Sequence, residues 1–187
     1  NFLTSIFNHK DYELINHLKS NTIKIPSPEN RNKELLKFVS KKYKNIFLST
    51  GAAKISEIKQ SLNYLSKNNV TVMHCVSAYP CNDEIVNLDR INSLKKISKN
   101  LGLSDHTHDI LSCLFSLSQG ITLIEKHFTI DNNLPGRDNK FAVLPHKFLE
   151  LKKNIDRYKL MTKKNTKTFI IQEKEIRKVY TGRWSKK

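Results

Sequence analysis

Short apolar runs alternate with amphipathic stretches along most of the chain, and this alternation limits the possible folds more than any other feature. The runs are continuous instead of alternating in polarity, which is typical of parallel strands that are covered on both faces. Repeated strand–helix units of this kind predict a parallel sheet with right-handed crossovers. The expected strands span residues 2–7, 22–26, 46–50, 70–77, 102–104 and 123–129.

Between these runs, apolar residues recur at i, i+3, i+4 and i+7, a spacing that predicts helices with one buried face. The expected helices span residues 33–41, 55–65, 88–97, 110–117 and 148–158, and residues 12–18 fit the pattern less cleanly. Six strands and six helices predict an α/β fold, a (β/α)8 TIM barrel of which about six βα units are present. A complete barrel needs about 250 residues, whereas this chain has 187. We therefore expect the first two strands to be missing.

The expected domain organisation is one barrel domain over residues 1–160, incomplete at its N-terminus, and a basic tail over residues 161–187. The chain begins with Asn1 instead of Met, which suggests a start partway into a longer protein. No apolar stretch approaches the roughly 20 residues that span a bilayer, and the first residues lack the pattern of a signal peptide. The three cysteines show no CxxC spacing, which indicates free thiols in a reducing, cytoplasmic compartment.

The formal net charge of +16 leaves open a nucleic-acid-binding function. However, the lysines are scattered over helix-like faces, and the sequence contains no arginine-rich arm, zinc finger or aromatic RNA-binding strand. We therefore expect a solvated basic surface that attracts anionic substrates, with neither nucleic acid nor a membrane as partner.

Polar and ionisable residues follow each expected strand. They are Thr4 and Ser5, then Lys24 with Ser27 and Glu29, then Ser49, Thr50 and Gly51, then His74 with Ser77 and Tyr79, then Ser104, Asp105 and His106, and finally Glu125 with His127. The active site of a barrel is built from the C-terminal ends of its strands and the loops after them. The sequence therefore predicts a common site at this rim.

Glu125 and His127 are two residues apart on one expected strand and so point to the same face. With His106 on the neighbouring strand, they form a plausible cradle for a divalent metal such as Mn, Zn, Fe or Co. Two histidines alone are a weak metal signal, so two structural histidines remain the alternative.

Hydroxyls that stand where strands turn into helices suggest a phosphate site, because backbone N–H groups are available there. They belong to Ser27, to Ser49 and Thr50, and to Ser104, and Lys24 would supply the positive charge. Individually each hydroxyl is more often a helix N-cap. Together, on neighbouring strands, they favour an anion site.

Six segments of the chain resemble the sialic acid synthase family, which includes N-acetylneuraminate, legionaminic and pseudaminic acid synthases. They are KIPSPE (24–29), LSTG (48–51), HCVSAYP (74–80), GLSDHT (102–107), EKHFT (125–129) and LPGRD (134–138). The segments run in the family's order with similar spacing. Their combination is specific, although no single segment would be.

The resemblance implies an enzyme that condenses phosphoenolpyruvate with an open-chain N-acetylated aminosugar aldehyde. In this reaction C3 of the enol attacks the aldehyde, water adds at C2, and phosphate leaves by C–O cleavage. It also implies a Mn²⁺ or Mg²⁺ ion that acts as a Lewis acid on the aldehyde oxygen, and a homodimer at full length.

The resemblance assigns roles to individual residues. His106 and His127 match the metal ligands, and Glu125 and Asp138 match carboxylates near the metal-bound water and the sugar. The groups that match phosphoenolpyruvate ligands are Thr4, Lys24, Ser27, Ser49 and Ser104. Tyr79 and Glu29 match sugar-side or rim positions.

Three departures from the family pattern affect these expectations. Ser77 stands where neuraminate enzymes carry Asn, and a hydroxyl cannot make the bidentate contacts of an amide, which puts N-acetylmannosamine in doubt as the acceptor. The family's first two strands, which carry an active-site Glu and Lys, are absent, so we expect this polypeptide alone to be inactive. Many members end in an antifreeze-like domain, and none is expected after Trp184.

Three other functions remain open. The chain could be a non-catalytic or truncated barrel subunit that binds a phosphorylated metabolite, a nucleic-acid-binding protein, or another barrel metalloenzyme such as an aldolase or hydrolase. Consumption of phosphoenolpyruvate by the full-length protein separates the synthase from the third. A salt-dependent affinity for DNA or RNA would indicate the second.

Overall fold

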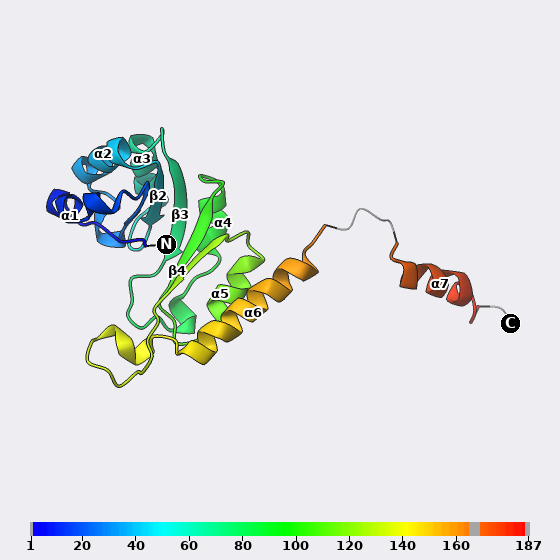
Figure 1. Cartoon of the computed structure of the whole chain (residues 1–187). Coiled ribbons are helices and arrows are strands. Elements are labelled where there is room, and N and C mark those ends of the chain that lie inside the picture. The colour runs from blue at the N-terminus through cyan, green and yellow to red at the C-terminus, as the bar shows by residue number, and fades with distance from the viewer. Residues whose placement is uncertain (1, 165–168, 186–187) are drawn as a thin grey trace. The chain divides into compact units, whose positions relative to one another are not determined.

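The computed structural model describes residues 2–164 and 169–185. These residues divide into two compact units, residues 1–155 and residues 156–187. The first unit contains the sheet and the helices around it, and the second contains the end of one long helix and one further helix (Figure 1).

The first unit is built on one parallel sheet whose spatial order follows the chain, β1-β2-β3-β4-β5. The strands are β1 Thr22–Ile25, β2 Asn45–Ser49, β3 Asn69–Cys75, β4 Leu101–Asp105 and β5 Leu123–Lys126. Each strand pairs with the next in parallel register. The sheet is a curled half-barrel, so the chain forms part of a (β/α)8 barrel, as the sequence predicted.

Helices connect the strands. They are α1 His9–Ile15, α2 Lys33–Lys42, α3 Ile55–Tyr64, α4 Arg90–Lys95, α5 Leu111–Leu117 and α6 Pro145–Met161, with α7 Ile171–Tyr180 in the second unit. Short 3-10 turns lie at residues 16–18, 27–29, 83–85 and 138–141. Asparagines begin two of the helices. Asn8 accepts hydrogen bonds from the Lys10 and Asp11 amides, and Asn32 accepts one from the Leu35 amide, as N-caps do.

The apolar core lies between the helices and the outer face of the sheet. Ile23, Ile25, Ile46 and Leu48 from β1 and β2 pack with Leu36 and other residues of α2. A second cluster joins residues of β3 and β4 to α3, which precedes β3, and to α4 and α5, which follow the two strands. The residues between these outward positions point to the inner face, so the inner face is free to carry polar groups.

The first expected strand is the main difference from the sequence prediction. Residues 2–7 form one isolated bridge, Ser5 to Lys24, instead of a strand. Two backbone hydrogen bonds hold it, from the Ile6 amide to the Lys24 carbonyl and from the Lys24 amide to the Thr4 carbonyl. Among the described residues, this segment pairs with β1 through this single bridge. The sheet therefore has five strands and not six.

The helix α7 lies within residues 161–187, for which the sequence analysis expects only a basic tail. Its apolar residues, Ile171, Ile176, Val179 and Tyr180, alternate with charged residues. The Glu173 carboxylate accepts a hydrogen bond from the Ile170 amide at the helix start. Within the described residues, no helix is both long enough and apolar enough to span a membrane.

Leu36 tests the core on α2. Its side chain is fully buried, so Leu36→Ala should lower the free energy of unfolding by about 2–5 kcal/mol through lost burial and a cavity. The matched control is Leu14→Ala on α1, where the leucine is 71% exposed and a change within about 0.5 kcal/mol is expected. Chemical denaturation measures both, and equal losses would contradict the placement of the core.

Candidate functional site

The strand register determines which side chains face the interior of the curled sheet. Ser104 on β4 is paired with Glu125 on β5, and the next pair along the ladder is Asp105 with Lys126. Successive residues of a strand point to opposite faces. Ser104 and Glu125 therefore share the inner face, whereas Asp105 and Lys126 share the outer face next to the helices.

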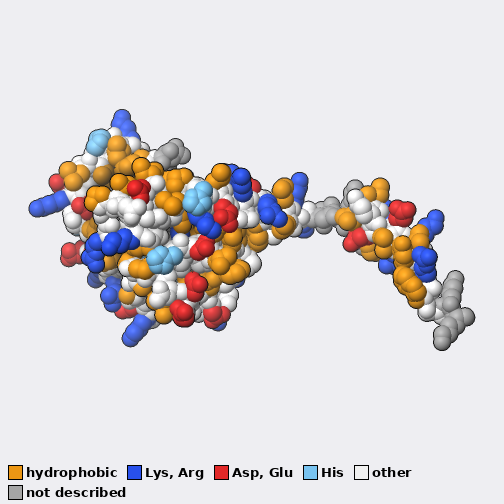
Figure 2. Space-filling model, turned by 90° about the horizontal axis from the view of Figure 1, so that it is seen from below, with side chains coloured by type: hydrophobic (Ala, Val, Ile, Leu, Met, Phe, Trp, Pro, Cys, Tyr) orange, Lys and Arg blue, Asp and Glu red, His pale blue; other side chains and the backbone are white. Residues whose placement is uncertain are grey.

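A cavity of about 900 Å³ opens at the C-terminal ends of the strands. It is lined by Ser5, Phe7, Lys24, Pro26, Tyr79, Ser104, Asp105, His106, Glu125, Lys126, His127, Gly136, Arg137, Asp138 and Asn139. Figure 2 shows histidine, basic and acidic side chains lying close together on one face of the molecule. The structure thus collects seven of the twelve predicted site residues around one hollow. They are Lys24, Tyr79, Ser104, His106, Glu125, His127 and Asp138.

An ion pair joins Lys24 and Glu125 across this cavity. The Lys24 Nζ lies 2.6 Å from Oε1 and 2.5 Å from Oε2 of Glu125. The two residues stand on β1 and β5, the first and last strands of the sheet, so their contact requires the sheet to curl. Burial alone would raise the pKa of Glu125, but the Lys24 ammonium and hydrogen bonds from Lys24 and Ser104 hold this pKa below its usual value.

His106 and His127 stand one residue beyond the last pair of the β4–β5 ladder. Their ring centroids are 5.4 Å apart. The Nδ1 atom of His106 is 2.7 Å from the Val76 carbonyl oxygen, which leaves Nε2 directed elsewhere. Burial lowers the pKa of His106 against the opposing effect of this hydrogen bond, and the neighbouring His127 lowers it further. His106 is therefore neutral near pH 7, the form that ligates metals.

The two imidazoles fit a shared divalent ion, but few other side chains are placed to bind the same ion. Among the described residues, no group of three or more His, Cys, Asp and Glu side chains is arranged to hold a metal. Two carboxylates lie near the imidazoles. Glu125 is bound to Lys24, and the Asp138 Oδ2 atom lies 3.7 Å from His127 Nδ1. The donor set therefore suits an ion that takes its remaining ligands from water or substrate, as Mn²⁺ and Mg²⁺ do more readily than a structural Zn²⁺.

Three of the predicted hydroxyls, those of Ser27, Ser49 and Ser77, do not line this cavity. The Ser27 hydroxyl accepts a hydrogen bond of 3.0 Å from the Gly51 amide and donates one to the Cys75 sulfur. A methyl group added at Gly51 would lie 2.2 Å from the Ser77 Oγ atom and 2.8 Å from the Ser27 Oγ atom. Glycine at position 51 thus lets the loop after β2 approach both serines. Ser49, at the end of β2, is buried with its hydroxyl toward the Met73 sulfur.

Two predicted residues lie at the edge of the arrangement. Thr4 lines a smaller hollow that shares Lys24 and Glu125 with the main cavity. Glu29 does not line the main cavity, and its carboxylate accepts a 2.8 Å hydrogen bond from the Asn32 side chain at the start of α2.

The sequence reasoning missed two groups near the site. A buried ion pair joins Asp105 to Lys126, with each side chain only 1% exposed. Arg90 on α4 donates to the carbonyls of Thr50 and Ala53 at 3.0 and 2.6 Å, and so holds the loop after β2. Only the three-dimensional register reveals the first group. The second could not be singled out from the sequence, because α4 and the residues after it carry other polar and basic side chains such as Asn92 and Lys95.

Comparisons with known proteins show the family to which the chain belongs. Residues 1–167 match the model of the NeuB family. Over 150 residues the chain is 41% identical to the N,N'-diacetyllegionaminic acid synthase of Campylobacter jejuni, covering 77% of this chain and 45% of that protein. It is 31% identical to a pseudaminic acid synthase of the same species, covering 75% of this chain and 42% of that protein. The chain spans less than half the length of these relatives.

Solved structures give the same result. An N-acetylneuraminic acid synthetase from Leptospira borgpetersenii superposes with a TM-score of 0.84 at 27% identity, covering 95% of this chain and 64% of that one. A DAHP synthase from Thermotoga maritima superposes with a TM-score of 0.72 at 16% identity, over 85% of this chain and 50% of that one. The second likeness concerns the fold alone.

Lys24→Met tests the electrostatics of the cavity. Without the ammonium, burial dominates at Glu125, so its pKa should rise above the wild-type value. Because the wild-type pKa is depressed, the pair stabilises the fold above the unfolded-state pKa of about 4.3, and this stabilisation disappears as the pH falls through the folded-state pKa. Carboxyl ¹³C NMR titration measures the pKa. Arg31→Met, which removes the partner of Glu57 instead, should leave the pKa of Glu125 unchanged, and an unchanged value in Lys24→Met would refute the pairing.

Proposed function

Because this chain belongs to the NeuB family, we propose that the complete protein is a nonulosonic acid synthase. It condenses phosphoenolpyruvate with an N-acetylated aminosugar aldehyde and water, and releases phosphate. The single observation that carries the proposal is the cavity in which a lysine–carboxylate pair lies beside two neighbouring imidazoles. We further propose a cytoplasmic homodimer.

Lys24 supplies the positive charge for phosphoenolpyruvate. It is the only lysine on the inner face of the five described strands that reaches the cavity, and its side chain is 15% exposed. In the absence of substrate Glu125 is its partner, so an incoming phosphate or carboxylate group competes with Glu125 for the same ammonium. Ser104 stands beside Glu125 on this face, and Ser27 and Ser49 lie deeper, at the ends of neighbouring strands.

Substrate binding therefore changes the state of Glu125. Its pKa is held down by Lys24, and a second anion at Lys24 weakens that influence. The pKa of Glu125 then rises toward the range in which a carboxyl group can take up and return a proton. Glu125 is placed to do so because Ser104 and Lys24 fix its position on the inner face. Asp138, on the other side of His127, supplies a second carboxylate at the mouth of the cavity.

His106 and His127 would hold the divalent ion. When bound there, Mn²⁺ or Mg²⁺ supplies Lewis acidity for the aldehyde oxygen. The hydrogen bond from His106 Nδ1 to the Val76 carbonyl fixes the tautomer and leaves Nε2 as the ligating atom.

The acceptor sugar is expected at the exposed side of the cavity, near Tyr79. This ring is 53% exposed and its centroid lies 4.1 Å from that of His106. Ser77 is exposed nearby, where a hydroxyl offers fewer contacts than an amide. This favours an acceptor other than N-acetylmannosamine, in keeping with the relatives that make legionaminic and pseudaminic acids. Glu29 can act at the rim only if its carboxylate gives up the hydrogen bond from the Asn32 side chain.

Phosphate release by the full-length protein tests the function directly. We expect inorganic phosphate to appear only when phosphoenolpyruvate, an N-acetylated aminosugar and Mn²⁺ are all present. Binding of phosphoenolpyruvate without turnover would instead support a non-catalytic barrel subunit. Release of phosphate without any sugar would count against a condensation.

Replacement of the two imidazoles tests the metal assignment. His106→Ala and His127→Ala should each abolish metal-dependent phosphate release by the full-length protein while the circular dichroism spectrum is retained, because each removes one ligand from a set of two. His146→Ala is the matched control, since His146 is exposed on the first turn of α6 and does not line the cavity. Full activity in either cavity variant would refute the assignment.

A further inference from the structure

The two histidines stand where the β4–β5 ladder has already ended. The last paired residues are Asp105 and Lys126, and His106 and His127 follow them directly. Backbone hydrogen bonds between the two strands therefore do not fix the distance between the imidazoles. His127 has its own support, because its carbonyl oxygen accepts a 2.9 Å hydrogen bond from the Val143 amide.

The side chain of Lys126 continues the connection beyond the ladder. Its ammonium contacts the Asp105 Oδ2 atom at 2.6 Å, the Thr107 Oγ1 atom at 3.1 Å and the Thr107 carbonyl oxygen. Asp105 and Thr107 are the residues on either side of His106. The Lys126 ammonium on β5 thus binds the residues directly before and after His106.

The Asp105 carboxylate, like the Lys126 ammonium, has several hydrogen-bond partners. It accepts hydrogen bonds from the Thr107 amide at 3.1 Å, from the Thr107 hydroxyl at 3.0 Å and from the Cys113 thiol at 3.2 Å, as well as from Lys126. Burial would raise the pKa of Asp105, but Lys126 and hydrogen bonds from Ser112 and the Thr107 amide keep this pKa below its usual value. All partners lie on the outer face, between the sheet and α5.

A buried ion pair of this kind is a poor means of stabilising a fold. The cost of removing two charges from water largely cancels their attraction, and apolar residues of similar size often serve as well. Its value lies in directional contacts that permit one arrangement only. The register places these contacts between the two inner-face pairs, Ser104 with Glu125 and His106 with His127.

We propose that the Asp105–Lys126 pair is a positioning device that sets the separation of the His106 and His127 imidazoles. Both side chains are almost fully buried, and the pair acts through the backbone on either side of His106. This inference rests on the proposed function, in which the two imidazoles hold one divalent ion.

The test measures Mn²⁺ binding to the full-length protein in the absence of substrates. Continuous-wave EPR gives the dissociation constant, and pulsed EPR counts the imidazole nitrogens coupled to the ion. The variants are Asp105→Asn, Lys126→Met and the double variant, which leaves no unpaired buried charge. We expect the double variant to bind Mn²⁺ about 10–100-fold more weakly and to show one coupled imidazole where the wild type shows two. Because the pair acts as a unit, the double variant should lose about as much Mn²⁺ affinity as either single variant. The two single losses should not add.

Leu36→Ala is the matched control for lost stability. Leu36 belongs to the other hydrophobic cluster, and this variant should retain the wild-type Mn²⁺ affinity and both nitrogen couplings. Lys126→Arg keeps the positive charge, and it provides the same test if the neutral variants do not fold. A planar guanidinium cannot reproduce the three ammonium contacts, so its affinity should also fall.

The outcomes separate the two proposals. A folded double variant, or Lys126→Arg, with wild-type affinity and two coupled nitrogens overturns the positioning role alone. Wild-type protein that does not bind Mn²⁺, or binds it equally well after His106→Ala, overturns the metal site and the positioning role together.

Discussion

The hydrogen-bond register of the five parallel strands is the constraint on which the rest of the molecule depends. It sends apolar side chains outward, where the helices cover them, and it sends Lys24, Ser104 and Glu125 to the interior. A shift of one residue in any strand would exchange these two faces. The same register that buries the core therefore assembles the site, and the two cannot vary independently.

Much of this arrangement could be predicted from the sequence, because both signals are local. Continuous apolar runs predicted β1 to β5, and polar residues at the run ends predicted a common rim. The bridge at Ser5 could not be anticipated, since strand formation depends on neighbours that a run of apolar residues does not reveal. Glu29 looks like a rim residue in the sequence, but a side-chain contact with Asn32 places it elsewhere. The Asp105–Lys126 pair was invisible because each charge lies between two inward-facing residues and only the register brings them together.

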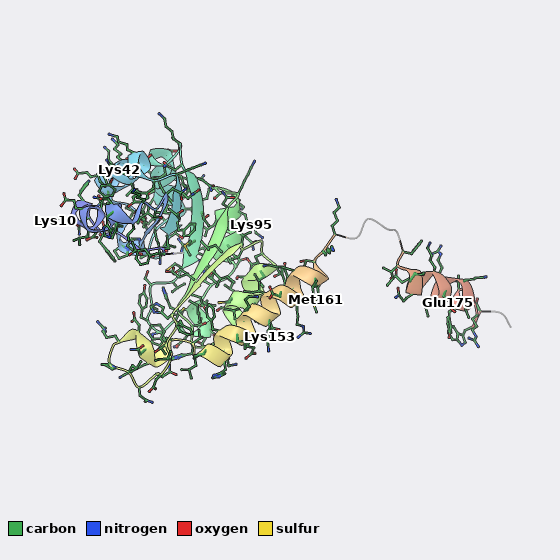
Figure 3. The ribbon with its side chains drawn as sticks, viewed as in Figure 1. Lys10, Lys42, Lys95, Lys153, Met161 and Glu175 are labelled. Atoms are coloured by element: carbon green, nitrogen blue, oxygen red, sulfur yellow. The ribbon has the colours of Figure 1, made fainter. Side chains whose placement is uncertain are left out.

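The structure separates the positive charge of the chain into exposed lysines and lysines paired with carboxylates. Lys10, Lys42 and Lys95 are exposed on α1, α2 and α4, as Figure 3 shows. By contrast, both lysines at the strand ends that line the cavity are paired with carboxylates. Exposed charges act over about 8 Å at physiological salt. The exposed lysines therefore determine the charge of the surface, whereas the lysines of the cavity are balanced by carboxylates of the chain itself.

The loop after β2 shows how contacts outside the cavity determine its shape. Gly51 allows Ser27 and Ser77 to approach the backbone, and Arg90 holds the Thr50 and Ala53 carbonyls from α4. A guanidinium presents several donors in a fixed plane, which suits it to hold two carbonyls of one turn. Its charge has no acidic partner among the ion pairs of the described residues. Carbonyl oxygens of this loop, and not a carboxylate, are therefore the partners of the guanidinium.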